Sequence, residues 1–194
     1  MDRLEDDLCA LAADFAALDP VCSVLAEGSI GRGEHRPGSD IDLVVISWRF
    51  DVLADELGWQ FERSLFNCDG GLEVKLDTGT YRGIRLDLHC RSPRNHVNLV
   101  MSGPVYRWGG TRILYDPSGI GRWGARCTER LLADNPGVAA ALKEFHDRHQ
   151  MWKRDKTTAR EFESQMEFGR SLDLTGLVRN YETFAGSVPA CRGR

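Results

Sequence analysis

One stretch of the sequence decides the fold: Gly28-Ser29-Ile30-Gly31-Arg32-Gly33-Glu34-His35-Arg36-Pro37-Gly38-Ser39-Asp40-Ile41-Asp42-Leu43-Val44-Val45. It begins with a Gly-Ser pair, continues through a loop of small and polar residues, and ends in an apolar run that opens with two carboxylates. Because side chains alternate between the two faces of a strand, Asp40 and Asp42 point the same way, while Ile41 and Leu43 point into the protein. The stretch therefore predicts a strand that carries a carboxylate pair at its start.

The chemistry of this stretch indicates a bound triphosphate. Two like charges on one face repel each other, whereas a divalent cation such as Mg2+ prefers carboxylate oxygens as ligands. Gly28 allows a close approach of the backbone, and Ser29 adds a hydroxyl and an N–H group, which together suit an anion. A phosphate seat beside metal-binding carboxylates predicts a nucleoside triphosphate bound through Mg2+. The alternative is a Gly-Ser turn before an ordinary strand whose two acids are solvated.

The same run resembles the signature of the nucleotidyltransferase superfamily with a DNA-polymerase-β-like fold. In that signature a Gly-Ser pair is followed by a loop and then by Asp-x-Asp. The form Gly-Ser-x-x-Arg-Gly, with Ser39 directly before Asp-x-Asp, is similar to the small bacterial members, including antibiotic nucleotidyltransferases. The resemblance covers roughly residues 20–117 and implies a third carboxylate on a later strand.

Asp87 is the candidate for that third carboxylate. Apolar and polar residues alternate over 72–76 and 84–90, which predicts a hairpin with residues 77–83 as its loop. On the second strand of this hairpin Asp87 and His89 share a face, and Asp87 occupies the position that the resemblance implies. The alternative for Asp87 is a half-exposed strand acid that pairs with Arg85.

The resemblance also implies a role for each residue of the site. Asp40 and Asp42 would ligate two Mg2+ ions, and Asp87 would hold the ion that activates the acceptor hydroxyl. The phosphate-binding residues would be Gly28 and Ser29, with Ser39 and Arg32 as weaker candidates for the same oxygens. Asp87 could accept the proton of that hydroxyl, and His89 is the alternative general base, unless it is simply a surface histidine of the strand.

Hydrophobic periodicity predicts the remaining elements. We expect an α/β (α+β) fold, with a mixed β-sheet, flanking helices and a small C-terminal helical segment. The expected domains are a nucleotidyltransferase domain at 1–119, a helical segment at 120–184 and a flexible tail at 185–194. Individual elements are expected as helices at 3–17, 51–66, 122–132, 138–150 and 153–174, strands at 21–26, 41–47 and 111–119, and an irregular segment at 91–110.

Composition excludes some classes of protein. The chain of 194 residues carries a net charge of −4, which argues against general adhesion to nucleic acid. Its six cysteines form no Cys-x-x-Cys pair, so we expect reduced thiols in place of a disulfide framework or a zinc site. No apolar run approaches the length of a membrane span, and the acidic start is unlike a signal peptide. These features predict a cytoplasmic protein, and a small domain with a helical extension could form a homodimer.

The predicted function is Mg2+-dependent transfer of a nucleoside monophosphate, AMP from ATP, to a hydroxyl of a small molecule. An antibiotic-like acceptor is the option that the resemblance suggests. Two alternatives stay open: transfer to a protein or a tRNA, as in toxin-antitoxin members of the superfamily, and a non-catalytic nucleotide-binding scaffold. The crowded acids argue against the scaffold, because a binding module has little use for them.

Overall fold

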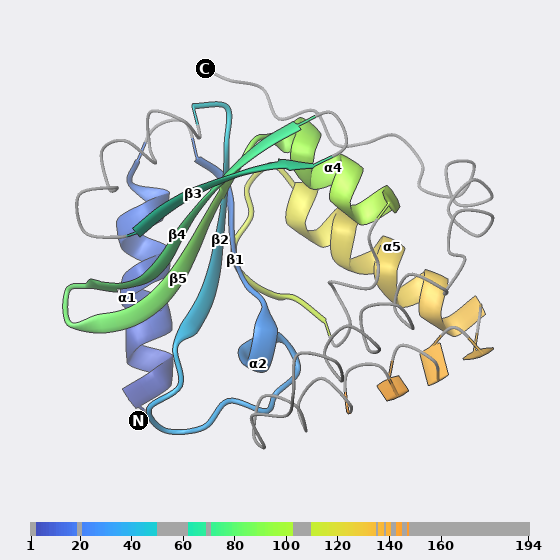
Figure 1. The fold of residues 1–194 in the computed structure, drawn as a ribbon, viewed down its shortest axis with the longest axis horizontal. Coiled ribbons are helices and arrows are strands. Elements are labelled where there is room, and N and C mark those ends of the chain that lie inside the picture. The colour runs from blue at the N-terminus through green and yellow to red at the C-terminus, as the bar shows by residue number, and fades with distance from the viewer. Residues whose placement is uncertain are drawn as a thin grey trace, which may run out of the picture.

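The computed structural model describes residues 3–18, 21–49, 62–68, 71–102 and 110–134, together with scattered positions between 136 and 147. These residues form one sheet with helices on both faces (Figure 1). In chain order the elements are α1 (Arg3–Ala16), β1 (Val21–Ala26), α2 (Gly28–Gly31), β2 (Ile41–Ser47), β3 (Glu62–Cys68), β4 (Gly71–Tyr81), β5 (Ile84–Arg91), α4 (Pro93–Ser102), β6 (Arg112–Tyr115) and α5 (Ile120–Asp134).

The sheet is mixed, as predicted. Its six strands lie in the order β3-β4-β5-β2-β1-β6. β2 and β5 run parallel to each other, and every other neighbouring pair is antiparallel. The two central strands are thus the ones that carry the predicted carboxylates. The predicted helices at 3–17 and 122–132 and the strands at 21–26 and 41–47 are confirmed as α1, α5, β1 and β2.

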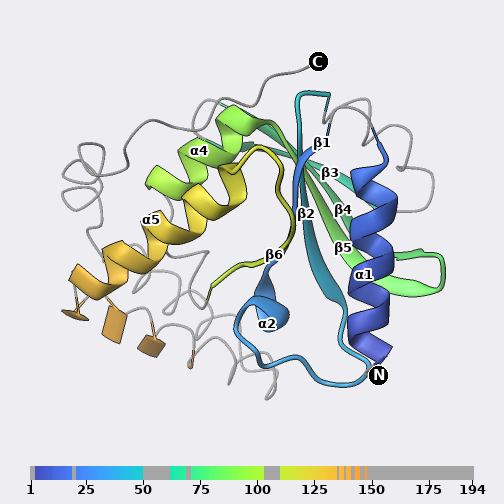
Figure 2. The same cartoon turned by 180° about the vertical axis from the view of Figure 1, so that it is seen from behind.

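Each face of the sheet is covered by different helices (Figures 1 and 2). α1 packs on the face that holds Ile41, Leu43 and Val45 of β2, as the alternation predicts. The opposite face holds Val44, which packs with Ile120 at the start of α5. Because helices cover both faces of β2, its sequence is an almost continuous apolar run. Every residue of the strand is buried except Asp42, which is half-buried.

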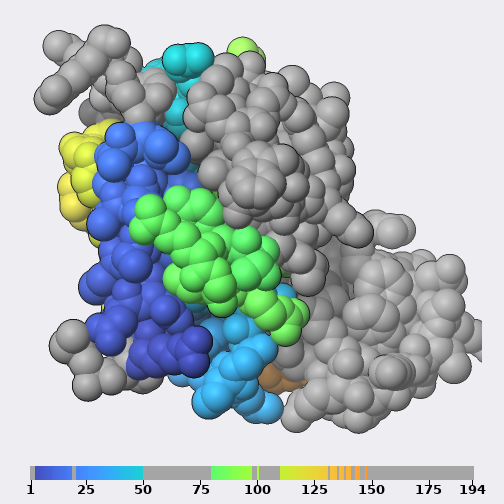
Figure 3. Space-filling model, turned by 90° about the vertical axis from the view of Figure 1, so that its left-hand side faces the viewer, coloured from blue at the N-terminus to red at the C-terminus, as the bar shows by residue number. Residues whose placement is uncertain are grey.

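The β4–β5 hairpin differs from the prediction. Residues 77–81 continue β4, and the turn is the two-residue Arg82-Gly83 in place of a loop over 77–83. Both turn residues have positive φ, 50° and 80°, as a type I′ turn requires. The tip of the hairpin lies against α1 (Figure 3). There Tyr81 packs on Phe15, and the Arg82 guanidinium lies 2.9 Å from the Asp14 carboxylate. This anchoring explains why the strand extends so far.

Two other element predictions are corrected. Part of the predicted helix 51–66 lies outside the described residues, and residues 62–66 belong to β3, which pairs with β4 along its whole length. A short apolar run is ambiguous in sequence, and pairing with a neighbouring strand decides its conformation. The predicted irregular segment 91–110 contains α4, which begins at Pro93 with Ser92 Oγ accepting a hydrogen bond from Asn95 N at 3.0 Å. Serine followed by proline is a helix-start signal.

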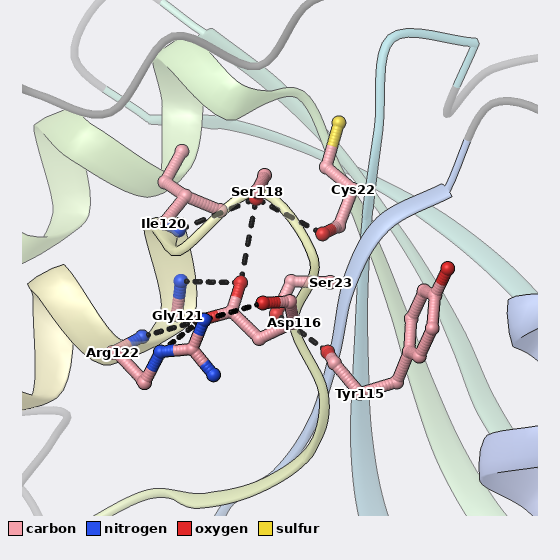
Figure 4. Close-up of polar contacts among 8 residues, drawn as sticks. All are labelled: Cys22, Ser23, Tyr115, Asp116, Ser118, Ile120, Gly121 and Arg122. Atoms are coloured by element: carbon pink, nitrogen blue, oxygen red, sulfur yellow. Dashed lines mark hydrogen bonds and ion pairs between the residues drawn. The ribbon is translucent and has the colours of Figure 1, made fainter.

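The start of α5 is fixed by the carboxylate of Asp116, which is fully buried (Figure 4). Its oxygens accept hydrogen bonds from Gly121 N at 3.2 Å, Arg122 N at 2.9 Å and Ser118 Oγ at 3.3 Å. Ser118 Oγ also lies 3.0 Å from the carbonyl oxygen of Cys22 on β1. Asp116 thus caps α5 and anchors it to the sheet.

Close contact between α5 and α4 depends on Gly124. A Cβ atom at this position would lie 2.9 Å from His96 Nε2 and 3.0 Å from a methyl carbon of Val100. The two helices therefore approach each other more closely than a larger residue would allow.

Four of the described cysteines, Cys9, Cys22, Cys90 and Cys127, are not joined in disulfides. None of the described helices has the length and apolar character needed to cross a bilayer. The predicted helices at 153–174 and the tail at 185–194 lie outside the described residues, whereas the described positions between 136 and 147 are helical.

Candidate active site

Two of the predicted carboxylates lie side by side. In the parallel pairing of β2 with β5, Asp42 stands in register with Asp87. Residues in register on neighbouring strands point to the same face, and both side chains are half-buried. That face is the one opposite α1, because Ile41 and Leu43, which flank Asp42, point toward α1. The fold thus concentrates two negative charges on one patch of the sheet.

Gly28 lies directly against Asp42. The Glu27 N–H donates to the Asp42 carbonyl oxygen at 2.9 Å, which holds the end of β1 against the start of β2. Gly28 follows with φ of +59°, and a Cβ atom there would lie 2.7 Å from Asp42 Cγ and closer still to Oδ2. Only glycine leaves room for the carboxylate in this position. The Gly-Ser pair and the Asp-x-Asp pair are therefore one structural unit.

The other predicted phosphate-binding residues lie on α2 and in the loop that joins α2 to β2. Ser29 belongs to α2, and its Oγ lies 3.5 Å from Nδ1 of His35 in the following loop. The Arg32 guanidinium is largely buried and contacts Glu34 Oε2 at 2.9 Å. Ser39 is exposed, and its N–H donates to the Arg36 carbonyl oxygen at 3.0 Å to close a turn. Gly28 and Ser29 thus flank the carboxylates, whereas Arg32 is held by a neighbouring acid.

Asp40 stands apart from the pair in register. It is half-buried and lies just before β2, which begins at Ile41. Within the described ranges, no three His, Cys, Asp or Glu side chains gather closely enough to hold a metal ion. Asp42 and Asp87 nevertheless fit a hard divalent cation by their oxygen chemistry and by the space that Gly28 leaves for one of them. Asp40 as a further ligand stays a prediction.

A buried ion pair beside the carboxylates was not predicted from the sequence. Arg91 NH1 lies 3.3 Å from Glu27 Oε1, and the two side chains are only 8% and 16% exposed. Glu27 directly precedes Gly28. Arg91 lies four residues after Asp87 on the same strand, so the alternation of side chains places both on one face of β5. The position of each residue near the site could therefore have been predicted from the sequence. The pairing itself joins residues 64 positions apart and has no local signature.

Residues 8–99 match the family described as a nucleotidyltransferase domain. This part of the chain is a nucleotidyltransferase domain. The match runs from α1 into α4 and includes Gly28, Ser29, Asp42 and Asp87. The resemblance of the opening stretch to nucleotidyltransferases is therefore confirmed, and the domain is that of an enzyme family, whereas the similarity to the small bacterial members stays a prediction.

Solved structures similar to the chain that bears this nucleotidyltransferase domain come from larger proteins. One is Cid1 in complex with the UTP analog UMPNPP, at 17% identity and a TM-score of 0.38, which covers 84% of this chain and 45% of that one. Another is terminal uridylyl transferase 4 from Trypanosoma brucei with bound CTP, at 16% identity and a TM-score of 0.35, which covers 76% and 46%. The chain thus spans less than half of these proteins. No curated protein matches it.

Proposed function

We propose that the nucleotidyltransferase domain transfers a nucleoside monophosphate, AMP from ATP, to a hydroxyl of a small-molecule acceptor with Mg2+ as cofactor. The observation that carries this proposal is the register of Asp42 with Asp87, with Gly28 leaving room for the Asp42 carboxylate. Two carboxylates in register on a sheet face repel each other, and a divalent cation suits such a pair as a ligand. The choice of acceptor follows the similarity of Gly-Ser-x-x-Arg-Gly to small bacterial members of the superfamily.

The proposed reaction forms one bond and breaks one. The acceptor oxygen bonds to the α-phosphorus, the bond from that phosphorus to the bridging oxygen breaks, and pyrophosphate leaves with the electron pair. Asp42 and Asp87, together with Asp40 just before β2, would hold divalent ions, which when bound stabilise negative charge on the attacking and leaving oxygens. Asp87 would accept the proton of the acceptor hydroxyl, and His89 on the same face is the alternative.

The phosphate groups of the nucleotide have candidate partners as well. Ser29 lies on α2 and Arg32 directly follows it, and they offer a hydroxyl and a guanidinium to phosphate oxygens. The Arg32 guanidinium contacts the Glu34 carboxylate at 2.9 Å. Binding of the triphosphate would therefore exchange one anionic partner of Arg32 for another.

Incubation with labelled nucleotides tests the proposal. The protein is mixed with each NTP and Mg2+ together with a panel of aminoglycosides and lincosamides, total tRNA, or cell lysate. We expect label on a small molecule and stoichiometric release of pyrophosphate. Label on RNA or on a protein would replace the proposed acceptor, and ATP binding without pyrophosphate release in any mixture would favour a scaffold.

A pair of isosteric variants separates the site from the rest of the domain. Asp42→Asn removes one carboxylate without changing its volume, and we expect loss of transfer with an unchanged circular dichroism spectrum. Asp6→Asn alters an exposed acid on α1 and should leave the rate as in the wild type. Wild-type turnover by Asp42→Asn would exclude the proposed role of Asp42.

A further inference from the structure

Three acids form a row across three adjacent strands. β1 and β2 pair antiparallel with Ala26 opposite Leu43, so the next residue, Glu27, stands opposite Asp42, to which its N–H group is hydrogen-bonded. Asp42 in turn is in register with Asp87 on β5. Because residues opposite one another share a face, Glu27, Asp42 and Asp87 project from the same side of the sheet.

Arg91 reaches this row from the far end of β5. On β5 it lies four residues beyond Asp87, and it stands opposite Ile46 of β2. The strand β2 separates it from Glu27, which follows β1. The two Cα atoms are therefore far apart, both across the sheet and along it. Only extended side chains can close such a gap, so the contact between Arg91 NH1 and Glu27 Oε1 crosses β2 diagonally on the face that carries the acids.

This contact is shielded from solvent. The Arg91 side chain is 8% exposed and the Glu27 side chain is 16% exposed. Charges so far removed from water act on their neighbours through a low effective dielectric constant, and salt screens them weakly. The pair is thus neutral as a unit, but each of its members carries a full charge on the face of the sheet that also carries Asp42 and Asp87.

We propose that Glu27 and Arg91 are a positioning pair that sets the affinity of the Asp42–Asp87 site for a divalent cation. The inference rests on the proposed function, because that function requires such a cation. Glu27 engages the Arg91 guanidinium at 3.3 Å and so offsets part of the positive charge that this arginine brings to the face of the two aspartates. Arg91 in turn compensates the third charge of the row, so that Glu27 does not crowd Asp42.

The proposal predicts opposite effects for the two members of one ion pair. Glu27→Gln leaves the positive charge of Arg91 beside the aspartates and should weaken cation binding. Arg91→Gln leaves a third negative charge in the row and should strengthen cation binding. A pair with a merely structural role would shift affinity in the same direction in both variants, through loss of folded protein.

Direct measurement of Mn2+ binding by electron paramagnetic resonance tests this prediction without any assay of turnover. We expect binding at least about fivefold weaker in Glu27→Gln and at least about fivefold tighter in Arg91→Gln, as for a unit charge near a divalent ion at a partly screened site. The double variant removes both charges and should return to within about twofold of the wild type. If one single variant fails to fold, the other single variant and the double variant still give the test.

Controls separate this inference from the proposed function. Glu5→Gln breaks the Glu5–Arg112 pair, which joins α1 to β6 on the surface, and should bind Mn2+ like the wild type. Asp42→Asn should abolish binding. If Asp42→Asn abolishes binding but both members of the Glu27–Arg91 pair can be replaced without a change in affinity, the positioning role is wrong and the proposed function stands. If the wild type binds no Mn2+, both are wrong.

Discussion

Replacement of Gly28 by alanine is the most direct test of how the site is built. The added methyl group would lie 2.7 Å from Asp42 Cγ, where ordinary contact begins near 3.4 Å, and it would overlap Oδ2. The Asp42 carboxylate must therefore move by roughly 1 Å, and a displacement of that size costs about 10²-fold in rate when a reacting group is misplaced. We expect kcat/KM of Gly28→Ala to fall by at least this factor.

Gly28→Ala should lose stability for two reasons, the left-handed backbone at this position and the overpacking of the site. The same substitution at Gly33 measures the backbone effect alone. Gly28 has φ of +59°, and Gly33 has φ of +69° with no atom within 4 Å of the position that a Cβ would take. Alanine in the left-handed region costs about 1–2 kcal/mol at either position, which in a chain of this size lowers Tm by about 2–8 °C. Gly28→Ala also overpacks the site, at about 1–3 kcal/mol more.

Two assays on both variants give the answer: thermal unfolding by circular dichroism, and pyrophosphate release with ATP and the acceptor identified in the labelling experiment. Gly33→Ala should lose stability and keep most of its activity, whereas Gly28→Ala should lose more stability and nearly all activity. Equal activity in the two folded variants would refute the inference that Gly28 is there to make room for the Asp42 carboxylate.

Three further predictions concern α5 and the residues that hold it in place. Asp116→Ala removes the cap of α5 and should lower the free energy of unfolding by about 1–3 kcal/mol in a urea titration, whereas a change below about 0.5 kcal/mol would contradict the capping role. Gly124→Ala should lower Tm because α4 leaves no room for a methyl group, while Gly137→Ala, at an open helical position, should leave it unchanged or raise it, and a higher Tm for the first variant than for the second would contradict this packing. Burial raises the pKa of the Cys127 thiol above its ordinary 9.0, so its contribution to stability is complete below pH 9.0 and is lost as pH rises through the folded-state pKa. Cys127→Ala should therefore lose less stability than the wild type in urea titrations between pH 9 and 10.5, and identical losses would show that the buried thiol is not responsible.

Periodicity in the sequence predicted the elements that build the core. β2 could be located because its apolar residues are bounded by charged and polar ones, and its inward face agrees with Ile41, Leu43 and Val45 in the core against α1. α1 and α5 have amphipathic patterns long enough to be unambiguous. These segments carry most of their structural information in residues that are neighbours along the chain.

Elements that depend on distant partners were missed. The helix expected to extend to residue 66 gives way to β3 over residues 62–66, because pairing with β4 satisfies its backbone hydrogen bonds. β4 continues through residue 81, where Tyr81 packs on Phe15 of α1. The start of α4 is a different case, because Ser92 and Pro93 form a local signal from which it could have been predicted.

The sequence by itself determined that a glycine, a serine and two alternating aspartates stand where a strand begins, and that Asp87 lies on a later strand, because those properties follow from the order of residues and the period of a strand. Only the tertiary structure decided that Asp42 is in register with Asp87 and that Arg91 reaches Glu27 across β2. The physical reason is that parallel strands are joined by long connections, so no local turn sets their register. Register is set instead by burial on both faces of the sheet, to which residues from the whole domain contribute.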